Sequence, residues 1–204
     1  MDRREAVKYI SILLGASVVG ADAMLLGCKS DTGRTREFTP DNIAFLNEVG
    51  ETILPQTSTP GAKAANVGEF MKVMVNDTYE EADQTAFFEG MEKLNAASKK
   101  KFDNDFMKIS PAQRQELLIE IDKEAKQYQK DKVDPFNKTE REKQAKDKAY
   151  KRQRIAPHYF MMMKQLTLLG FFTSEAGSKA VRYLPVPGRY EGCIDYKKGD
   201  KLIV

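Results

Sequence analysis

Apolar side chains recur every three or four residues along most of this chain, and this period constrains its fold more than any other feature. Ile43, Leu46 and Ile53 show the spacing in the first such segment. Before them, Thr39-Pro40-Asp41 combines a hydroxyl cap, a proline and an acid, which is typical of a helix start. The alternation that marks β-strands is scarce, so the pattern predicts an all-α fold.

Two later segments predict further helices. Ser110-Pro111-Ala112-Gln113 has the form of a capping box with proline in the first turn. The run from Tyr159 to Leu169 is apolar almost all round, which predicts the buried central helix, with Gly170 as its C-terminal cap. Its three adjacent methionines point about 100° apart on a helix. They therefore favour core or interface packing over a shared soft-metal or haem site.

The segment between these two helices is polar. Residues 131–138 contain Asp134-Pro135 and are interpreted as a linker or excursion. From Thr139 onward, Lys, Glu and Gln predict a helix that Pro157 kinks or restarts. Residues 99–154 hold 17 basic and 11 acidic side chains. Because the two signs are mixed and aromatics are sparse, this pattern indicates a solvated helical face rather than a nucleic-acid interface.

The C-terminal segment changes character. Pro185, Pro187, Gly188 and Gly192 predict a loop or a short hairpin. A length of 204 residues suits one domain. We therefore expect a single helical domain over residues 39–204 with an irregular C-terminal tail, preceded by a signal peptide.

The first 27 residues have the composition of that signal peptide. Arg3-Arg4 precedes a mostly apolar run that ends at Leu25-Leu26-Gly27-Cys28. The arginine pair resembles a twin-arginine export signal, although Ala6 stands where a bulky residue is usual and leaves a Sec-type signal open. The last four residues resemble a bacterial lipobox, which predicts lipidation of Cys28, with a cysteine near an ordinary cut as the alternative. Residues 28–38 then form a polar tether.

The composition excludes most independent chemistry. The chain has one histidine, two cysteines and no tryptophan. A structural zinc site needs about four Cys or His ligands, and covalent haem attachment needs a C-x-x-C-H motif. No nucleophile motif surrounds His158, the only imidazole. We expect no catalytic, cofactor-binding or metal-binding residue in this chain.

His158 and Cys193 remain as candidates for other roles. His158 follows Pro157 at a predicted helix start, where it is either an exposed polar residue or a contact to a partner. Cys193 has no partner in its own chain if Cys28 carries a lipid. In an oxidising compartment, such a cysteine indicates a bond to another subunit or a shielded thiol.

Three longer stretches resemble a known family. They are residues 51–70 (ETILPQTSTPGAKAANVGEF), 109–114 (ISPAQR) and 164–193, which opens on KQLTLLGFFTSEAG and ends on PVPGRYEGC. In this order they resemble the gluconate 2-dehydrogenase subunit 3 family, the small subunits of membrane-associated sugar and sugar-acid dehydrogenases. The resemblance covers roughly residues 40–195, nearly all of the expected mature chain.

The resemblance implies an accessory role. Members of the family are helical, cofactor-free partners of a flavoprotein of the glucose–methanol–choline type, which holds FAD and oxidises the sugar. A cytochrome c subunit, where present, accepts the electrons in its haem. The small subunit often carries the export signal for both proteins, so the resemblance implies a periplasmic complex, here attached to the membrane through Cys28.

Partner contacts follow from the same resemblance. We expect Phe171, Phe172 and Tyr183 to be exposed and to pack on the flavoprotein, with His158 and Cys193 as further candidate contacts. The alternative hypothesis is a free-standing periplasmic lipoprotein that binds a small molecule or acts as a scaffold. A deep polar pocket without a large exposed apolar patch would favour that alternative.

Overall fold

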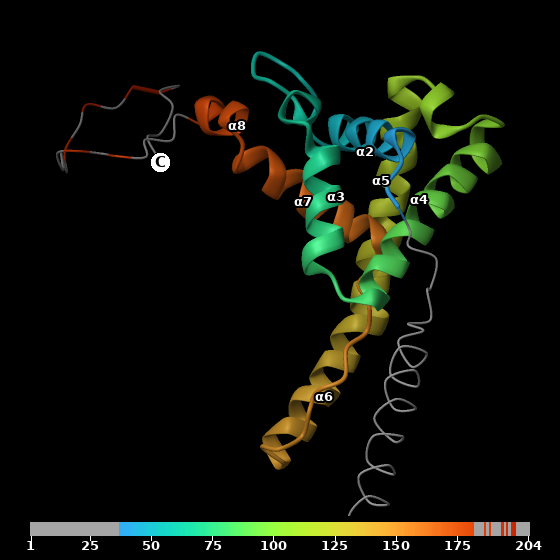
Figure 1. Ribbon diagram of the computed structural model, residues 1–204, viewed down its shortest axis with the longest axis vertical. Helices are drawn as coiled ribbons and strands as arrows, with labels where there is room; N and C mark the ends of the chain where they lie inside the picture. The colour runs from blue at the N-terminus through green and yellow to red at the C-terminus, as the bar shows by residue number, and fades with distance from the viewer. Residues whose placement is uncertain are drawn as a thin grey trace, which may run out of the picture. The chain divides into compact units, whose positions relative to one another are not determined.

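The computed structural model describes residues 37–181 together with 186, 188, 193, 195, 197 and 198. The expected export arginines Arg3 and Arg4, Cys28 and Tyr183 lie outside this range. Within the described residues the chain forms helices and no strand, which confirms the all-α prediction. With the labels of Figure 1, the helices are α2 (Pro40–Ile53), η1 (Ala62–Ala65), α3 (Val67–Thr78), α4 (Glu81–Phe102), η2 (Phe106–Lys108), α5 (Pro111–Tyr128), η3 (Gln129–Val133), α6 (Asp134–Lys146), α7 (Tyr159–Phe172) and α8 (Glu175–Ala180).

The predicted helix starts at Thr39 and Ser110 are confirmed, and capping boxes begin both α2 and α5, although the sequence predicts a box only at Ser110. The Thr39 hydroxyl oxygen accepts a hydrogen bond from the Asn42 backbone N–H at 3.2 Å, and the Asn42 side-chain oxygen accepts one from the Thr39 N–H at 3.0 Å. Ser110 and Gln113 make the same reciprocal pair at the start of α5. These bonds satisfy backbone donors that the first helical turn leaves free.

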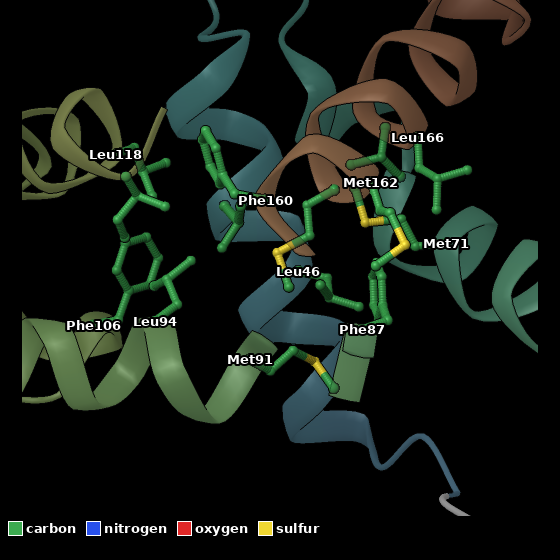
Figure 2. Close-up of a cluster of buried hydrophobic side chains, with 14 of the residues drawn as sticks. Leu46, Met71, Phe87, Met91, Leu94, Phe106, Leu118, Phe160, Met162 and Leu166 are labelled. Atoms are coloured by element: carbon green, nitrogen blue, oxygen red, sulfur yellow. The ribbon is translucent and has the colours of Figure 1, made fainter. Parts of the chain in front are cut away.

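The core is built around α7. This helix packs against α2, α3, α4, α5 and α8. Met162 and Met163 are buried in the core cluster, part of which Figure 2 shows, whereas Met161 is half-buried; two of the three adjacent methionines thus pack in the core. Where α7 crosses α4, a Cβ added to Gly90 would lie 2.2 Å from the Tyr159 side chain, so a glycine is needed for this approach.

Two predicted boundaries are wrong. Residues 131–138 are not a linker, because α5 continues through the π turn η3 directly into α6; the alternative of an excursion agrees with α6 extending away from the other helices (Figure 1). Pro135 donates no N–H to the preceding turn, and the π turn η3 lies directly before it, where the helix already departs from regular α-helical bonding. Gly170 does not cap α7. The helix runs on to Phe172, and Gly170 faces Phe70 of α3, whose ring would lie 2.7 Å from an added Cβ.

The predicted helix after Thr139 is also shorter than expected, because α6 ends at Lys146. The chain then turns and runs back along α6 to His158 without helical structure. We call residues 129–157 the arm. Figure 1 shows α6 and its returning segment extending away from the other helices. Among the helices, α6 packs mainly on η3, which directly precedes it.

Candidate partner-binding surface

The C-terminal half of α7 turns an apolar face to solvent. Leu168 is 39% exposed, Leu169 is 46% exposed and Phe172 is 48% exposed. Spacings of three and four residues place Leu168 and Leu169 on the same helix face as Phe172. We call these three side chains the α7 stripe. Large apolar side chains that lie together in water are typical of an interaction surface rather than of a solvated helix.

Buried contacts on the opposite side of α7 hold the stripe in place. Leu166, Thr167 and Phe171 are buried, and the Thr167 hydroxyl donates to the Met163 carbonyl at 2.8 Å. The rings of Phe171 and Phe172 meet edge to face with centroids 5.2 Å apart. The helix therefore cannot rotate to bury the stripe without exposing its core side.

The turn into α8 fixes the end of the stripe. The Ser174 hydroxyl donates to the Phe171 carbonyl at 2.6 Å and accepts from the Gly177 N–H at 3.1 Å, which caps α8. A Cβ on Gly177 would lie 2.0 Å from the Phe171 carbonyl oxygen. The sequence Ser174-Glu175-Ala176-Gly177 thus makes a tight corner directly after Phe172 that only glycine permits.

The expected contact residues divide between the core and the surface. Phe172 is exposed as expected, but Phe171 is 3% exposed, so its expected exposure is wrong. Adjacent helical residues point about 100° apart, and here Phe171 points to the core while Phe172 points to solvent. Cys193 is exposed, and its bond to another subunit stays a prediction.

Leu168 and Leu169 were missed because the run was assigned to the core all round. The available signal was Gln165, an exposed polar residue three and four positions before them on the same face.

His158 caps the start of α7. Its Nδ1 accepts a hydrogen bond from the Phe160 N–H at 3.3 Å, and its ring packs against Tyr128 and Tyr159. The side chain is only 10% exposed, so the alternative of an exposed polar residue is wrong, whereas a partner contact stays a prediction. Burial lowers the pKa of the imidazole, with Glu124 opposing and Lys93 adding to the shift. The neutral ring is therefore the one that caps the helix.

This cap predicts a pH-dependent stability. The unfolded imidazole binds a proton below its ordinary pKa of about 6.5, whereas the buried one stays neutral to lower pH. The unfolded state therefore gains protons first, and we expect the free energy of unfolding to fall as the pH drops below about 6.5. Protonation of Nδ1 also removes the acceptor that caps Phe160. Urea unfolding between about pH 7.5 and about pH 5 measures the slope of the free energy of unfolding against pH.

His158→Asn supplies the control for this slope. Asparagine keeps a capping oxygen at the helix start and does not titrate. The variant is expected to show a flatter dependence over the same range. Coincident slopes for the two proteins would assign the pH dependence to other groups.

A shallow groove of about 600 Å³ lies between α2, α4 and η2, with Phe45, Met91 and Met107 among its lining residues. Its carboxylate Asp105 is bound by Asn95, Lys99 and Lys108. The hydrogen bond from the Asn95 amide, followed by those from Lys99 and Lys108, holds the pKa of Asp105 well below its ordinary value. A carboxylate that stays ionised in this way is a poor general acid or base near neutral pH.

Among residues 37–181 and the few described beyond them, no group of three His, Cys, Asp or Glu side chains is placed to hold a metal ion. In the same part of the chain, no helix is both long enough and apolar enough to cross a membrane.

Fold and surface together define an all-helical domain that offers an apolar helix face for contact. The sequence model of one family, described as Gluconate 2-dehydrogenase subunit 3, matches residues 40–188. The match covers well over half of the chain, and the protein belongs to this family. The family name describes one subunit of a dehydrogenase with several subunits. Comparison with curated proteins and with solved structures found no match.

Proposed function

We propose that this chain is the non-catalytic small subunit of an exported FAD-dependent sugar or sugar-acid dehydrogenase of the glucose–methanol–choline type. FAD is held by the large flavoprotein subunit, and a cytochrome c subunit with haem accepts the electrons where the complex has one. The small subunit aids the folding, export and membrane attachment of the flavoprotein. Family membership and the α7 stripe support this proposal.

The α7 stripe is the observation that carries the proposal. Protein interfaces are centred on apolar and aromatic side chains that lose their water on binding. Leu168, Leu169 and Phe172 form such a centre on a helix whose other face is locked in the core. In the proposed complex, this surface packs on the flavoprotein, and the signal in residues 1–27 directs both subunits to the periplasm.

Co-expression tests the proposal. A tagged flavoprotein subunit is produced with and without this chain, and its co-purification and its FAD-loaded fraction in the periplasm are measured. We expect the two proteins to co-purify and the exported fraction to collapse when this chain is omitted. Cys28→Ser is expected to leave the complex intact but to release it from membranes that are washed in high salt, which removes purely electrostatic attachment. Normal export of the flavoprotein alone, together with failure to co-purify, would contradict the proposal.

A further inference from the structure

The arm differs from the rest of the domain in charge. Residues 129–157 carry ten Lys and Arg against five Asp and Glu, a net charge of +5. Residues 38–128 carry ten basic and sixteen acidic side chains, a net charge of −6. Within residues 38–157 the positive charge is therefore concentrated on the arm, which extends away from the other described helices (Figure 1).

Most of the arm's cations are free of ion pairs. Within the described part of the chain, only Lys143 and Arg154 of these ten side chains are paired with a carboxylate. The unpaired ones include Lys146, Lys148 and Lys151 around the end of α6, and all three are exposed. Charges that have no partner within their own fold are available to a partner of opposite sign.

The arm is a folded element with fixed charge positions. The Glu140 side chain is buried against the returning segment, where it binds Lys143 at 2.7 Å, the Tyr150 hydroxyl at 3.0 Å and the Gln153 N–H at 2.7 Å. At the base of the arm, the Tyr128 hydroxyl donates to the Ala156 carbonyl at 3.2 Å. Because these bonds join α6 to its returning segment, the backbone that carries the cations is already ordered. Binding therefore requires no further loss of backbone conformational entropy.

The chemistry of the arm favours a headgroup layer over a protein surface. Among the described residues, none of the large apolar side chains that are exposed lies in the arm. Protein interfaces are depleted of lysine and need buried apolar or aromatic anchors, which the α7 stripe has and the arm does not. Scattered cations without an apolar anchor are instead typical of attraction to anionic lipid.

The position of the tether agrees with a membrane contact. Phe38, where the tether enters the domain, packs on Phe88 of α4 with ring centroids 4.5 Å apart. Asp83, five residues earlier on the same helix, binds Arg154 of the arm at 3.0 Å. Phe38, the first residue of the described core, therefore lies near the base of the arm.

The lengths of the two segments are also compatible. Residues 28–38 can span at most about 40 Å. The helical part of the arm, residues 129–146, is about 27 Å long. A lipid on Cys28 and the end of the arm can therefore reach one surface.

We propose that the arm binds anionic phospholipid headgroups and gives the domain a second attachment to the membrane. The inference rests on the proposed function for its compartment, since an exported, lipidated chain meets a membrane surface. A cationic patch beside a lipid anchor adds electrostatic attraction to an anionic surface and selects which face of the domain meets that surface. The negative charge of residues 38–128 is repelled by the same surface, which would orient the domain with the arm toward the membrane.

Vesicle binding by the unlipidated protein tests the proposal. The chain from residue 28 onward keeps every described core residue, because the core cluster begins at Phe38, and Cys28→Ser removes the lipidation site. Sedimentation with vesicles of phosphatidylcholine, with or without phosphatidylglycerol, measures partitioning. We expect binding only to the anionic vesicles and its loss in high salt.

Two matched double variants locate the contact. Lys148→Gln with Lys151→Gln removes two charges from the arm, and Lys100→Gln with Lys123→Gln removes two exposed, unpaired charges from α4 and α5. The arm pair is expected to weaken partitioning roughly fivefold per cation, about 25-fold together, while the body pair leaves it nearly unchanged. Equal losses from both pairs, equal binding to neutral vesicles, or no binding would overturn the proposal.

The same variants separate this inference from the proposed function. The arm pair is expected to co-purify with the flavoprotein as well as the unmodified chain does, because the α7 stripe is untouched. Loss of co-purification in the arm pair would reassign the arm to a protein contact. A salt-sensitive dimer in sedimentation velocity that the arm pair abolishes would reassign it to a second copy of this chain. Failure of vesicle binding alone would leave the proposed subunit role standing.

Discussion

Replacing Phe87 with alanine is expected to lower the free energy of unfolding by about 3–5 kcal/mol. The side chain is fully buried on α4, in the same cluster as Leu46 and Met71 (Figure 2). Its ring also lies against Phe38, with centroids 6.2 Å apart. Truncation removes the buried apolar area and leaves a cavity that neighbours on three helices cannot fill without moving.

Denaturant unfolding of the purified domain measures this loss. Phe172→Ala provides a matched control, because it deletes the same ring from a position that is about half exposed. We expect the control to cost less than about 1 kcal/mol. Similar losses of unfolding free energy in the two variants would mean that burial does not determine how much these rings contribute to stability. That result would contradict the assigned core.

The helix starts were predictable because their chemistry is local. The bonds of Thr39 and Ser110 are made to residues three positions away, so the sequence contains both partners in one short window. The end of α6 was not predictable in this way. Where α6 ends depends on the bonds of Glu140 to Tyr150 and Gln153. These two residues reach Glu140 only when the returning segment is folded against α6.

The candidate surface was predictable only in part, for a different reason. A run such as Tyr159 to Phe172 is apolar at nearly every position, so its period does not distinguish the face that packs on neighbours from the face that is left free. Which residues are buried is decided by α2, α3, α4 and α5, far away in sequence. Phe171 and Phe172 are adjacent and chemically identical, and only this packing separates them.

The second large effect concerns the α7 stripe. Leu169→Asp combined with Phe172→Asp is expected to weaken binding to the flavoprotein subunit at least about a hundredfold, because central interface residues each contribute about 2 kcal/mol or more. The two carboxylates would also have to lose their water against an apolar partner surface. Both positions are about half exposed in the free domain, so the fold itself should be retained, which circular dichroism and the unfolding curve check.

Pull-down from co-expressing cells measures the binding, and Met107→Asp is the matched control. Met107 is also an exposed apolar residue, but it lies in η2 at the groove between α2 and α4. The control is expected to co-purify normally. If Met107→Asp abolished binding while the stripe variant did not, the partner would dock in the groove and the stripe would need another explanation. The stripe variant adds two carboxylates and the control adds one, so Leu169→Asp and Phe172→Asp are also tested singly. A loss of binding in either single variant but not in Met107→Asp identifies the surface rather than the charge.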